Sequence, residues 1–455
     1  MVQKRENSLA TIILLFALLL FVFIFQLLLQ GRGAGEKTSE IPEGGDLAVI
    51  GGTTAALLTA WEAAANGAQV FLFPNGQALG EDSVWLVESG LAAVSTPPQQ
   101  ERGIEFTPEM LTAYLREYGG GINDPLLLIS FRSAASDLFQ RAAELGGVSF
   151  TLLPQPEQRP YLHYSPEPRA GLLFKEHLWE KVENAGVVIR EEKIKEIALA
   201  PAGQVEALLL EDSDGETTPF YVQAVVLADG GYSGDVHYWH DYLPRGNLLN
   251  LRPDQQGQGL RRAEDLGLDR VQMGFLETRL LLSSPVNGQI AFLPPDPWRE
   301  AYYFNRKGQV LSGKETSFPE IVNFILHSPA DGAFILAPGE RAAAFSSCFR
   351  EFATWEDLER SGLVVGESLF SGWRLPGPPY DVATLKVGVA YTLGGLSVTP
   401  RGEVKQEGEV VKGLYAAGEI VGGLHGEALL PGMALSETLF TSGVAGRCAA
   451  EYAGR

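Results

Sequence analysis

A short glycine-containing segment near the start of the sequence has the spacing of a phosphate-binding turn. It reads Gly51-Gly52-Thr53-Thr54-Ala55-Ala56 and follows the apolar run Asp46 to Ile50. A strand, a tight turn and a helix in this order bring backbone N–H groups and the positive end of the helix dipole to a diphosphate. Gly51 and Ala56 satisfy the first and third positions of G-x-G-x-x-G, but Thr53 stands at the second, where its side chain takes space that phosphates need. The turn therefore predicts either a dinucleotide site or a strand-turn-helix that has kept only its packing.

The elements that would position this turn form a βαβ unit. Thr54 to Asn66 is an Ala/Leu-rich helix and Ala68 to Phe73 a second apolar strand, which together predict a parallel sheet. In a dinucleotide site the second strand ends in an acidic residue that bonds the ribose hydroxyls. Pro74 stands there instead, and its side chain neither donates nor accepts a hydrogen bond. We expect weakened nucleotide binding.

A second glycine-rich series lies at the C-terminal end. It runs from Gly413 to Glu419, through Gly422-Gly423-Leu424-His425-Gly426, to Gly432-Met433-Ala434-Leu435, and reads as a strand, a loop and a helix start. With Ala228-Asp229-Gly230-Gly231 and Leu393-Gly394-Gly395-Leu396, the series resembles the flavoprotein family of fumarate reductases, succinate dehydrogenases and their soluble relatives (FAD-binding type 2). The resemblance extends from Asp46 to the C-terminus.

The resemblance implies an α/β fold, in which an inserted α+β cap domain interrupts a Rossmann-like FAD-binding domain. We expect residues 46–235 and 379–455 to form the FAD-binding domain and residues 236–378 the cap, the substrate-facing domain. The sequence supports these boundaries because it turns aromatic and Pro-rich beyond Tyr232 and changes back near Pro379.

The resemblance also implies FAD as the cofactor. In relatives the glutamate matching Glu419 bonds FAD hydroxyls, and the backbone matching Ala434 and Leu435 meets the flavin pyrimidine edge at a helix N-terminus, whose dipole favours negative charge. His425 is either a flavin contact or a satisfied buried histidine, and Glu419 otherwise caps the end of a buried strand. The expected FAD contacts are Gly51, Gly52, Thr54, Ser83, Gly90, Glu419, His425, Ala434 and Leu435.

The loop that wraps the FAD phosphates and the flavin ring in relatives matches the segment around Ser83 and Gly90. Glu81 and Glu88 stand where that family has glycines. Two carboxylates beside phosphates would repel them, which again predicts weakened FAD binding.

The residues that clamp and protonate a dicarboxylate in fumarate reductases are replaced here. The matching positions carry Leu429, Tyr391, Phe318 and Arg279. Because leucine and phenylalanine hold neither a carboxylate nor a proton, a fumarate or succinate reaction is predicted to be absent. The remaining catalytic candidates are Arg279 and Arg299, which suit an anion or a quinone carbonyl, and Tyr391, which suits a carbonyl. Each also reads as a surface ion pair or as packing.

The N-terminus carries an apolar run, Leu9 to Leu29, about 30 Å long as a helix, which is enough to span a bilayer. We expect a cytoplasmic tail (residues 1–8), a transmembrane anchor (9–30) and a linker (31–45). Two basic residues precede the run and favour a cytoplasmic N-terminus, with the large domain outside. A cleaved secretory signal is the alternative.

Composition narrows the classes of partner and site. The 455 residues include 56 acidic and 35 basic ones, a net charge of -21, which excludes nucleic acid as the main partner. Cys348 and Cys448 are too far apart in sequence for a structural zinc site, and His237 to Asp241 reads as an aromatic loop at the cap edge. No metal site is predicted.

Three functions remain open. The first is a membrane-anchored FAD-dependent oxidoreductase that transfers a hydride between a small substrate and flavin and passes electrons to a quinone or a redox protein. The second is a non-catalytic binding or scaffold protein on the membrane surface. The third is a ketosteroid-dehydrogenase-like enzyme for an apolar ring, which Leu429, Leu430 and Pro431 suggest.

Overall fold

The computed structural model describes residues 44–454, with gaps at 212–214, 236–237, 239–247, 285–289, 294–300, 330–331, 338–341, 344 and 364–376. The predicted anchor at residues 9–30 and the candidate Arg299 lie outside the described residues. Within the described ranges, no helix combines the length and the apolar character that a membrane span requires.

The first sheet contains the predicted βαβ unit. β1 (Gly44–Ile50) pairs in parallel with β2 (Val70–Phe73) on one side and with β9 (Thr217–Leu227) on the other. β21 (Glu409–Ala416) adds a further parallel strand beside β9. The carboxyl ends of these strands are buried apolar runs because both of their faces are covered there, as is usual for parallel strands. The chain thus returns to the same sheet from its far end, as the resemblance implies.

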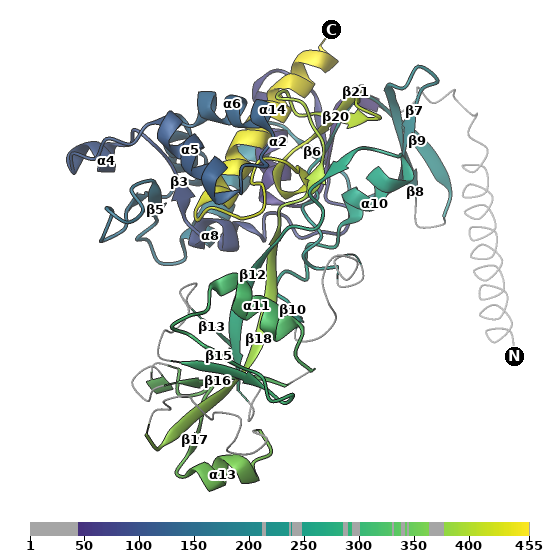
Figure 1. Ribbon diagram of the computed structural model, residues 1–455. Helices are drawn as coiled ribbons and strands as arrows, with labels where there is room; N and C mark the ends of the chain where they lie inside the picture. The colour runs from purple at the N-terminus through teal and green to yellow at the C-terminus, as the bar shows by residue number, and fades with distance from the viewer. Residues whose placement is uncertain are drawn as a thin grey trace, which may run out of the picture. The chain divides into compact units, whose positions relative to one another are not determined.

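Two helices cover the centre of this sheet. α2 (Thr54–Ala65) follows β1, and α14 (Met433–Ala453), yellow in Figure 1, packs along it. Gly446 permits the close approach, because a Cβ atom there would lie 2.8 Å from the Thr59 carbonyl oxygen. The two glycine-rich segments of the sequence therefore begin helices that lie side by side.

The remaining elements of this part surround the sheet. They are α3 (Ser83–Glu88), β3 (Leu91–Ala92), α4 (Pro97–Glu101), α5 (Pro108–Tyr118), α6 (Pro125–Ala134), α7 (Leu138–Gly146), β4 (Thr151–Leu152), β5 (Leu162–Tyr164), α8 (Ala170–Asn184), β6 (Val188–Ile189), β7 (Lys193–Leu199), β8 (Val205–Glu211), α10 (Gln258–Asp265), β11 (Arg270–Val271), β19 (Gly395–Leu396), β20 (Glu403–Gln406) and the 3₁₀ turn η2 (Gly418–Ile420).

A second sheet is built around the long strand β18 (Tyr380–Thr392). Its other elements are β10 (Leu248–Asn250), β12 (Leu276–Ser283), β13 (Ile290–Phe292), β14 (Tyr302–Asn305), β15 (Val310–Ser312), α11 (Phe318–Leu326), β16 (Ala333–Ala337), β17 (Arg350–Phe352) and α13 (Trp355–Arg360). β18 pairs with β12 as far as Thr392, and its end contacts η2. This strand therefore belongs to the second sheet, although its sequence lies in the segment expected to return to the FAD-binding domain.

The Phe220 side chain of β9 packs against aromatic side chains of β2 in the first sheet. Its ring lies 4.9 Å from that of Phe71 and 5.6 Å from that of Phe73, and the Arg190 guanidinium lies 5.2 Å above it. We expect Phe220→Ala to lower the free energy of unfolding by about 3–5 kcal/mol, because it leaves a cavity among aromatic rings. Phe292→Ala is the control, since that side chain is 60% exposed. The free energy of unfolding is measured by denaturant titration. If the two variants lower it equally, the role of Phe220 is contradicted.

Candidate functional site

The N-terminus of α2 is closed by the residue that departs from the glycine pattern. The Thr53 hydroxyl donates to the Ala228 carbonyl (2.6 Å) and accepts from the Ala56 N–H (3.2 Å), so Thr53 is the helix N-cap. Gly51 before it has φ +131°, and a Cβ atom there would lie 2.4 Å from the Ala228 oxygen. The turn thus needs its first glycine for the approach of β9, and Thr53 ties the same two elements together.

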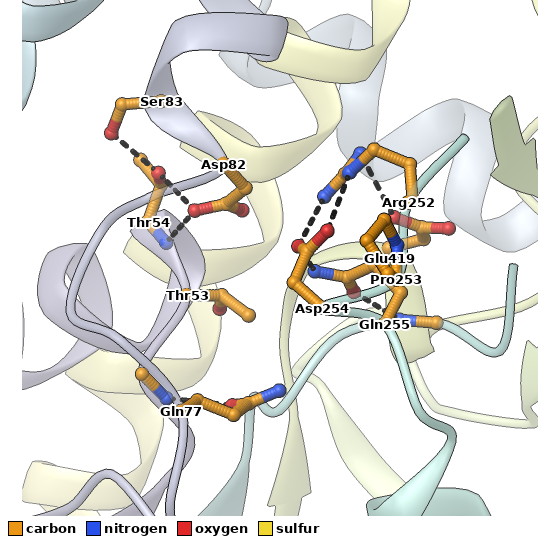
Figure 2. A network of polar contacts seen from close by, with 12 residues as sticks. Thr53, Thr54, Gln77, Asp82, Ser83, Arg252, Pro253, Asp254, Gln255 and Glu419 are labelled. Atoms are coloured by element: carbon orange, nitrogen blue, oxygen red, sulfur yellow. Dashed lines mark hydrogen bonds and ion pairs between the residues drawn. The ribbon is translucent and has the colours of Figure 1, made fainter. Parts of the chain in front are cut away.

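A carboxylate from the next segment sits on the same helix end. Asp82 Oδ1 accepts from both the Thr54 N–H and the Thr54 hydroxyl, each at 2.7 Å, and Ser83 Oγ lies 2.7 Å from that hydroxyl. Figure 2 shows this group on one side of the polar network. Burial raises the pKa of Asp82, and the Arg252 charge partly opposes that shift. An internal anion therefore uses donors that a nucleotide phosphate would use at a helix N-terminus.

Gln77 satisfies the main chain on the other side of the turn. Its Oε1 accepts from the Gly52 N–H and its Nε2 donates to the Asp229 carbonyl, both at 2.8 Å. Between this residue, Asp82 and the 253–256 loop lies a cavity of about 260 Å³. Its lining includes the carboxylates of Glu81, Asp82 and Asp254, which makes it an unfavourable place for a free anion.

Glu419 lies across the network from Asp82, in η2 at the end of β21. Its Oε1 accepts from the Thr392 N–H (2.8 Å) and hydroxyl (3.0 Å), and its Oε2 lies 3.9 Å from the Arg252 guanidinium. Burial raises the pKa of Glu419 to about 7, against the opposing effects of Arg252 and of the hydrogen bonds from Thr392. This carboxylate therefore titrates near neutrality.

Arg252 links this carboxylate to an aromatic stack. The guanidinium also pairs with Asp254 (3.2 Å) and lies 5.0 Å from the centre of the Trp85 ring. Trp85 also stacks on Tyr391, with ring centres 5.3 Å apart and planes 16° from parallel. The indole therefore contacts both Arg252 and Tyr391.

A buried polar triad continues from the stack into α14. The Tyr391 hydroxyl donates to Glu437 Oε2 (2.6 Å), and His425 Nε2 lies 2.8 Å from the same oxygen. Burial, and then the Glu437 charge, raise the pKa of Tyr391 well above its usual value, so its hydroxyl keeps its proton. Within the described part of the chain, His425 Nδ1 and Glu437 Oε1 have no hydrogen-bond partner.

Most of the expected FAD contacts come together at these elements. Thr54 and Ser83 meet at Asp82, and Ala434 and Leu435 lie buried in the first turn of α14. Gly90, at φ +87°, follows α3 and closely approaches the His163 carbonyl.

Two of the expected residues have other surroundings. Arg279 forms an ion pair with Glu277, the residue two positions before it on β12. Glu88 is exposed and is not among the residues that line the cavity. Glu81 does line the cavity, but it pairs with Lys175. The helix α3 explains the difference, because it starts after Asp82 and carries Glu88 outward.

Four central residues were absent from the sequence prediction: Asp82, Trp85, Arg252 and Glu437. Glu437 had a readable signal, since a glutamate inside a long apolar helix needs a buried partner. The other three become neighbours only through folding, because Arg252 is distant in sequence from the loop that carries Asp82 and Trp85.

The pKa of Glu419 predicts a pH dependence of stability. Because the folded-state pKa (about 7) exceeds the usual 4.5, folding favours the protonated form. The contribution of Glu419 to the free energy of unfolding is fully present below pH 4.5. It is lost as the pH rises through 7, which lowers the free energy of unfolding by roughly 3 kcal/mol. Denaturant titrations from pH 4 to 8 should give a shallower decline for Glu419→Gln than for wild type. Equal slopes would contradict the assignment.

The triad predicts a stability effect of the Tyr391 hydroxyl. Tyr391→Phe removes a donor to a buried carboxylate and should lower the free energy of unfolding by about 1–3 kcal/mol. Adding Glu437→Gln should cost less in the Tyr391→Phe background than in wild type, because the two side chains interact directly. Additive losses in this double-mutant cycle would show that the two side chains do not interact.

Sequence comparisons identify relatives that match most of this chain. NADH:fumarate oxidoreductase of Klebsiella pneumoniae is 23% identical over 90% of this chain and 48% of its own length, so the chain spans about half of that relative. Fumarate reductase (cytochrome) of Shewanella frigidimarina is also 23% identical, over 90% of this chain and 77% of its own.

Solved structures share the fold. The open conformation of a flavocytochrome c3 fumarate reductase has a TM-score of 0.74 at 20% identity, covering 91% of this chain and 80% of the other. A 3-ketosteroid-Δ4-(5α)-dehydrogenase from Rhodococcus jostii has a TM-score of 0.70 at 20% identity, covering 91% and 99%. The FAD binding domain family matches residues 46–278 and 337–435. The chain therefore belongs to this FAD-binding family, together with the fumarate reductase flavoproteins, and the membership indicates FAD as its cofactor.

Proposed function

We propose that the protein is an FAD-dependent oxidoreductase acting on a substrate that lacks the two carboxylates of fumarate. The main support is the meeting of two segments far apart in sequence at the carboxyl ends of parallel strands. They are the turn before α2 and the end of β21 with Glu419, and α14 packs against both α2 and η2. Ligands of open α/β sheets bind at this edge.

The residues at the positions expected to contact substrate favour a neutral or apolar compound. Leu429 and Leu430 are buried apolar residues, and neither can hold an anion. Arg279 is paired with Glu277, and the Tyr391 hydroxyl is bound to Glu437. None of these side chains offers a free cation for a carboxylate. We therefore propose, more specifically, that the substrate is an apolar ring compound.

The described cavity beside α2 does not fit FAD as it stands. The cavity beside α2 has about 260 Å³, below the usual range of roughly 300–1,000 Å³ for small-molecule sites, and carboxylates line it. Beyond Arg252, protein atoms already bury Tyr391, Ala434 and Leu435 to 1% exposure or less. In this arrangement the place expected for the flavin ring is filled.

This filling favours a second candidate function, a non-catalytic member of the family that uses the fold as a binding or scaffold protein. The observation behind it is the set of internal partners for Thr54, Glu419 and Tyr391, each of which is already hydrogen-bonded to another side chain or backbone group of the chain.

The proposal includes a place at a membrane, with the large domain outside the cytoplasm. Its support is the apolar run from Leu9 to Leu29 and the basic residues before it. A quinone or a redox protein at the membrane would then accept the electrons. A reporter fused to the C-terminus of the full chain tests this topology, and cytoplasmic activity of the reporter would contradict it.

FAD titration of the purified full chain separates the two candidates. The oxidoreductase proposal predicts a perturbed flavin absorption band and a saturable affinity. It also predicts that Glu419→Ala weakens binding about tenfold, as expected for one hydrogen bond to a charged group. Glu88→Ala, at an exposed position away from the cavity, is the control. No binding of FAD by wild type or by either variant would favour the non-catalytic candidate.

A further inference from the structure

Both internal obstacles to FAD come from one short helix. Asp82 is the residue before α3 (Ser83–Glu88), and Trp85 lies in its first turn, three positions later. Residues three apart lie on the same side of a helix, so the carboxylate and the indole face the same region. We propose that this segment occupies the chain's own FAD site, with the Asp82 carboxylate in the place of a phosphate and the Trp85 indole in the place of the flavin ring. This inference deepens the proposed function and rests on it.

The phosphate part of the proposal follows from the donors that Asp82 uses. A diphosphate at this turn needs the first backbone N–H groups of α2, and the Thr54 N–H already donates to Asp82 Oδ1 at 2.7 Å. The Thr54 hydroxyl donates to the same oxygen, and Ser83 Oγ lies beside it. The carboxylate is thus bonded at the helix end as a phosphate oxygen would be (Figure 2). A nucleotide must displace it.

The charge of the surroundings makes Asp82 a competitor. Arg252 is the guanidinium of this network, and it already faces Asp254 and Glu419. A diphosphate would add two negative charges where three carboxylates share one cation. Because charges about 4 Å apart interact by several kcal/mol near a protein surface, removing the Asp82 charge should raise the affinity for a diphosphate markedly.

The ring part follows from where the stack begins and ends. Trp85 contacts both Arg252 and Tyr391, which lie 5.0 and 5.3 Å from the centre of its ring. Arg252 reaches Glu419, and Tyr391 bonds Glu437 in the second turn of α14. The stack therefore extends from Glu419 to the start of α14, the two places at which the family resemblance puts the FAD hydroxyls and the flavin edge. A planar indole that stacks on Tyr391 and contacts Arg252 fills space that a flavin would need.

Two ligands separate the two parts of the site. ADP carries the diphosphate without the flavin, whereas FAD carries both. Isothermal titration of the full chain should show that Asp82→Asn binds both ADP and FAD at least about tenfold more tightly than wild type. Trp85→Ala should raise the affinity for FAD by about tenfold or more and leave the affinity for ADP unchanged, because ADP has no flavin ring to accommodate.

Matched variants control for general loosening of the chain. Glu88→Gln removes a charge from the same helix at an exposed position, and Trp179→Ala removes a half-buried tryptophan from α8. Both should leave the two affinities within about twofold of wild type. Asp82→Asn keeps the size of the side chain. If Trp85→Ala does not fold, Trp85→Leu replaces it, with the same expected gain for FAD.

The outcomes distinguish this inference from the proposed function. Tight FAD binding by wild type, unchanged in Asp82→Asn and Trp85→Ala, would overturn the inference and leave the oxidoreductase proposal standing. A gain in ADP affinity for Asp82→Asn with no FAD binding by any variant would support the phosphate assignment, overturn the ring assignment and remove the support for a flavin enzyme. Equal gains in the controls would overturn both assignments.

Discussion

A shortage of positive charge among buried carboxylates is the constraint on which this site depends. Asp82, Glu419 and Glu437 approach the same edge of the first sheet, and the guanidinium that faces the first two is that of Arg252. Burial raises the pKa of Asp82 and of Glu419, whereas Arg252 opposes both shifts. Helix dipoles, hydroxyl donors and one cation stabilise the negative charge here, and each of them would otherwise be available to an anionic ligand.

The fold preserves its architecture while its side chains change the chemistry of the site. Thr53 departs from the glycine pattern of the turn, and it is the N-cap of α2 and bonds the Ala228 carbonyl. Tyr391 and His425 both bond Glu437 Oε2 within the core. A shared fold is compatible with such changes, because function is determined by the side chains of the site and not by the sheet that carries them.

The longest strand of the second sheet, β18, contributes two residues to the site. β18 lies in the middle of that sheet, and its last residue, Thr392, donates two hydrogen bonds to Glu419. Its neighbour Tyr391 forms one layer of the aromatic stack. Any change in the packing of β18 is therefore transmitted directly to the carboxylate expected to hold FAD hydroxyls and to the layer beside Trp85.

The parallel sheet, the return of the chain to it and the family could be predicted from the sequence, because apolar runs and glycine turns are local patterns whose order along the chain is informative. The same patterns drew attention to Glu419, Tyr391 and His425, which lie within them. The surroundings of these residues became known from the packing of the fold. Arg252 meets Trp85 and Glu419 across long stretches of sequence, and the Asp82 carboxylate reaches the end of α2 because α3 begins just after it. Such contacts depend on how elements pack, and no local pattern encodes them.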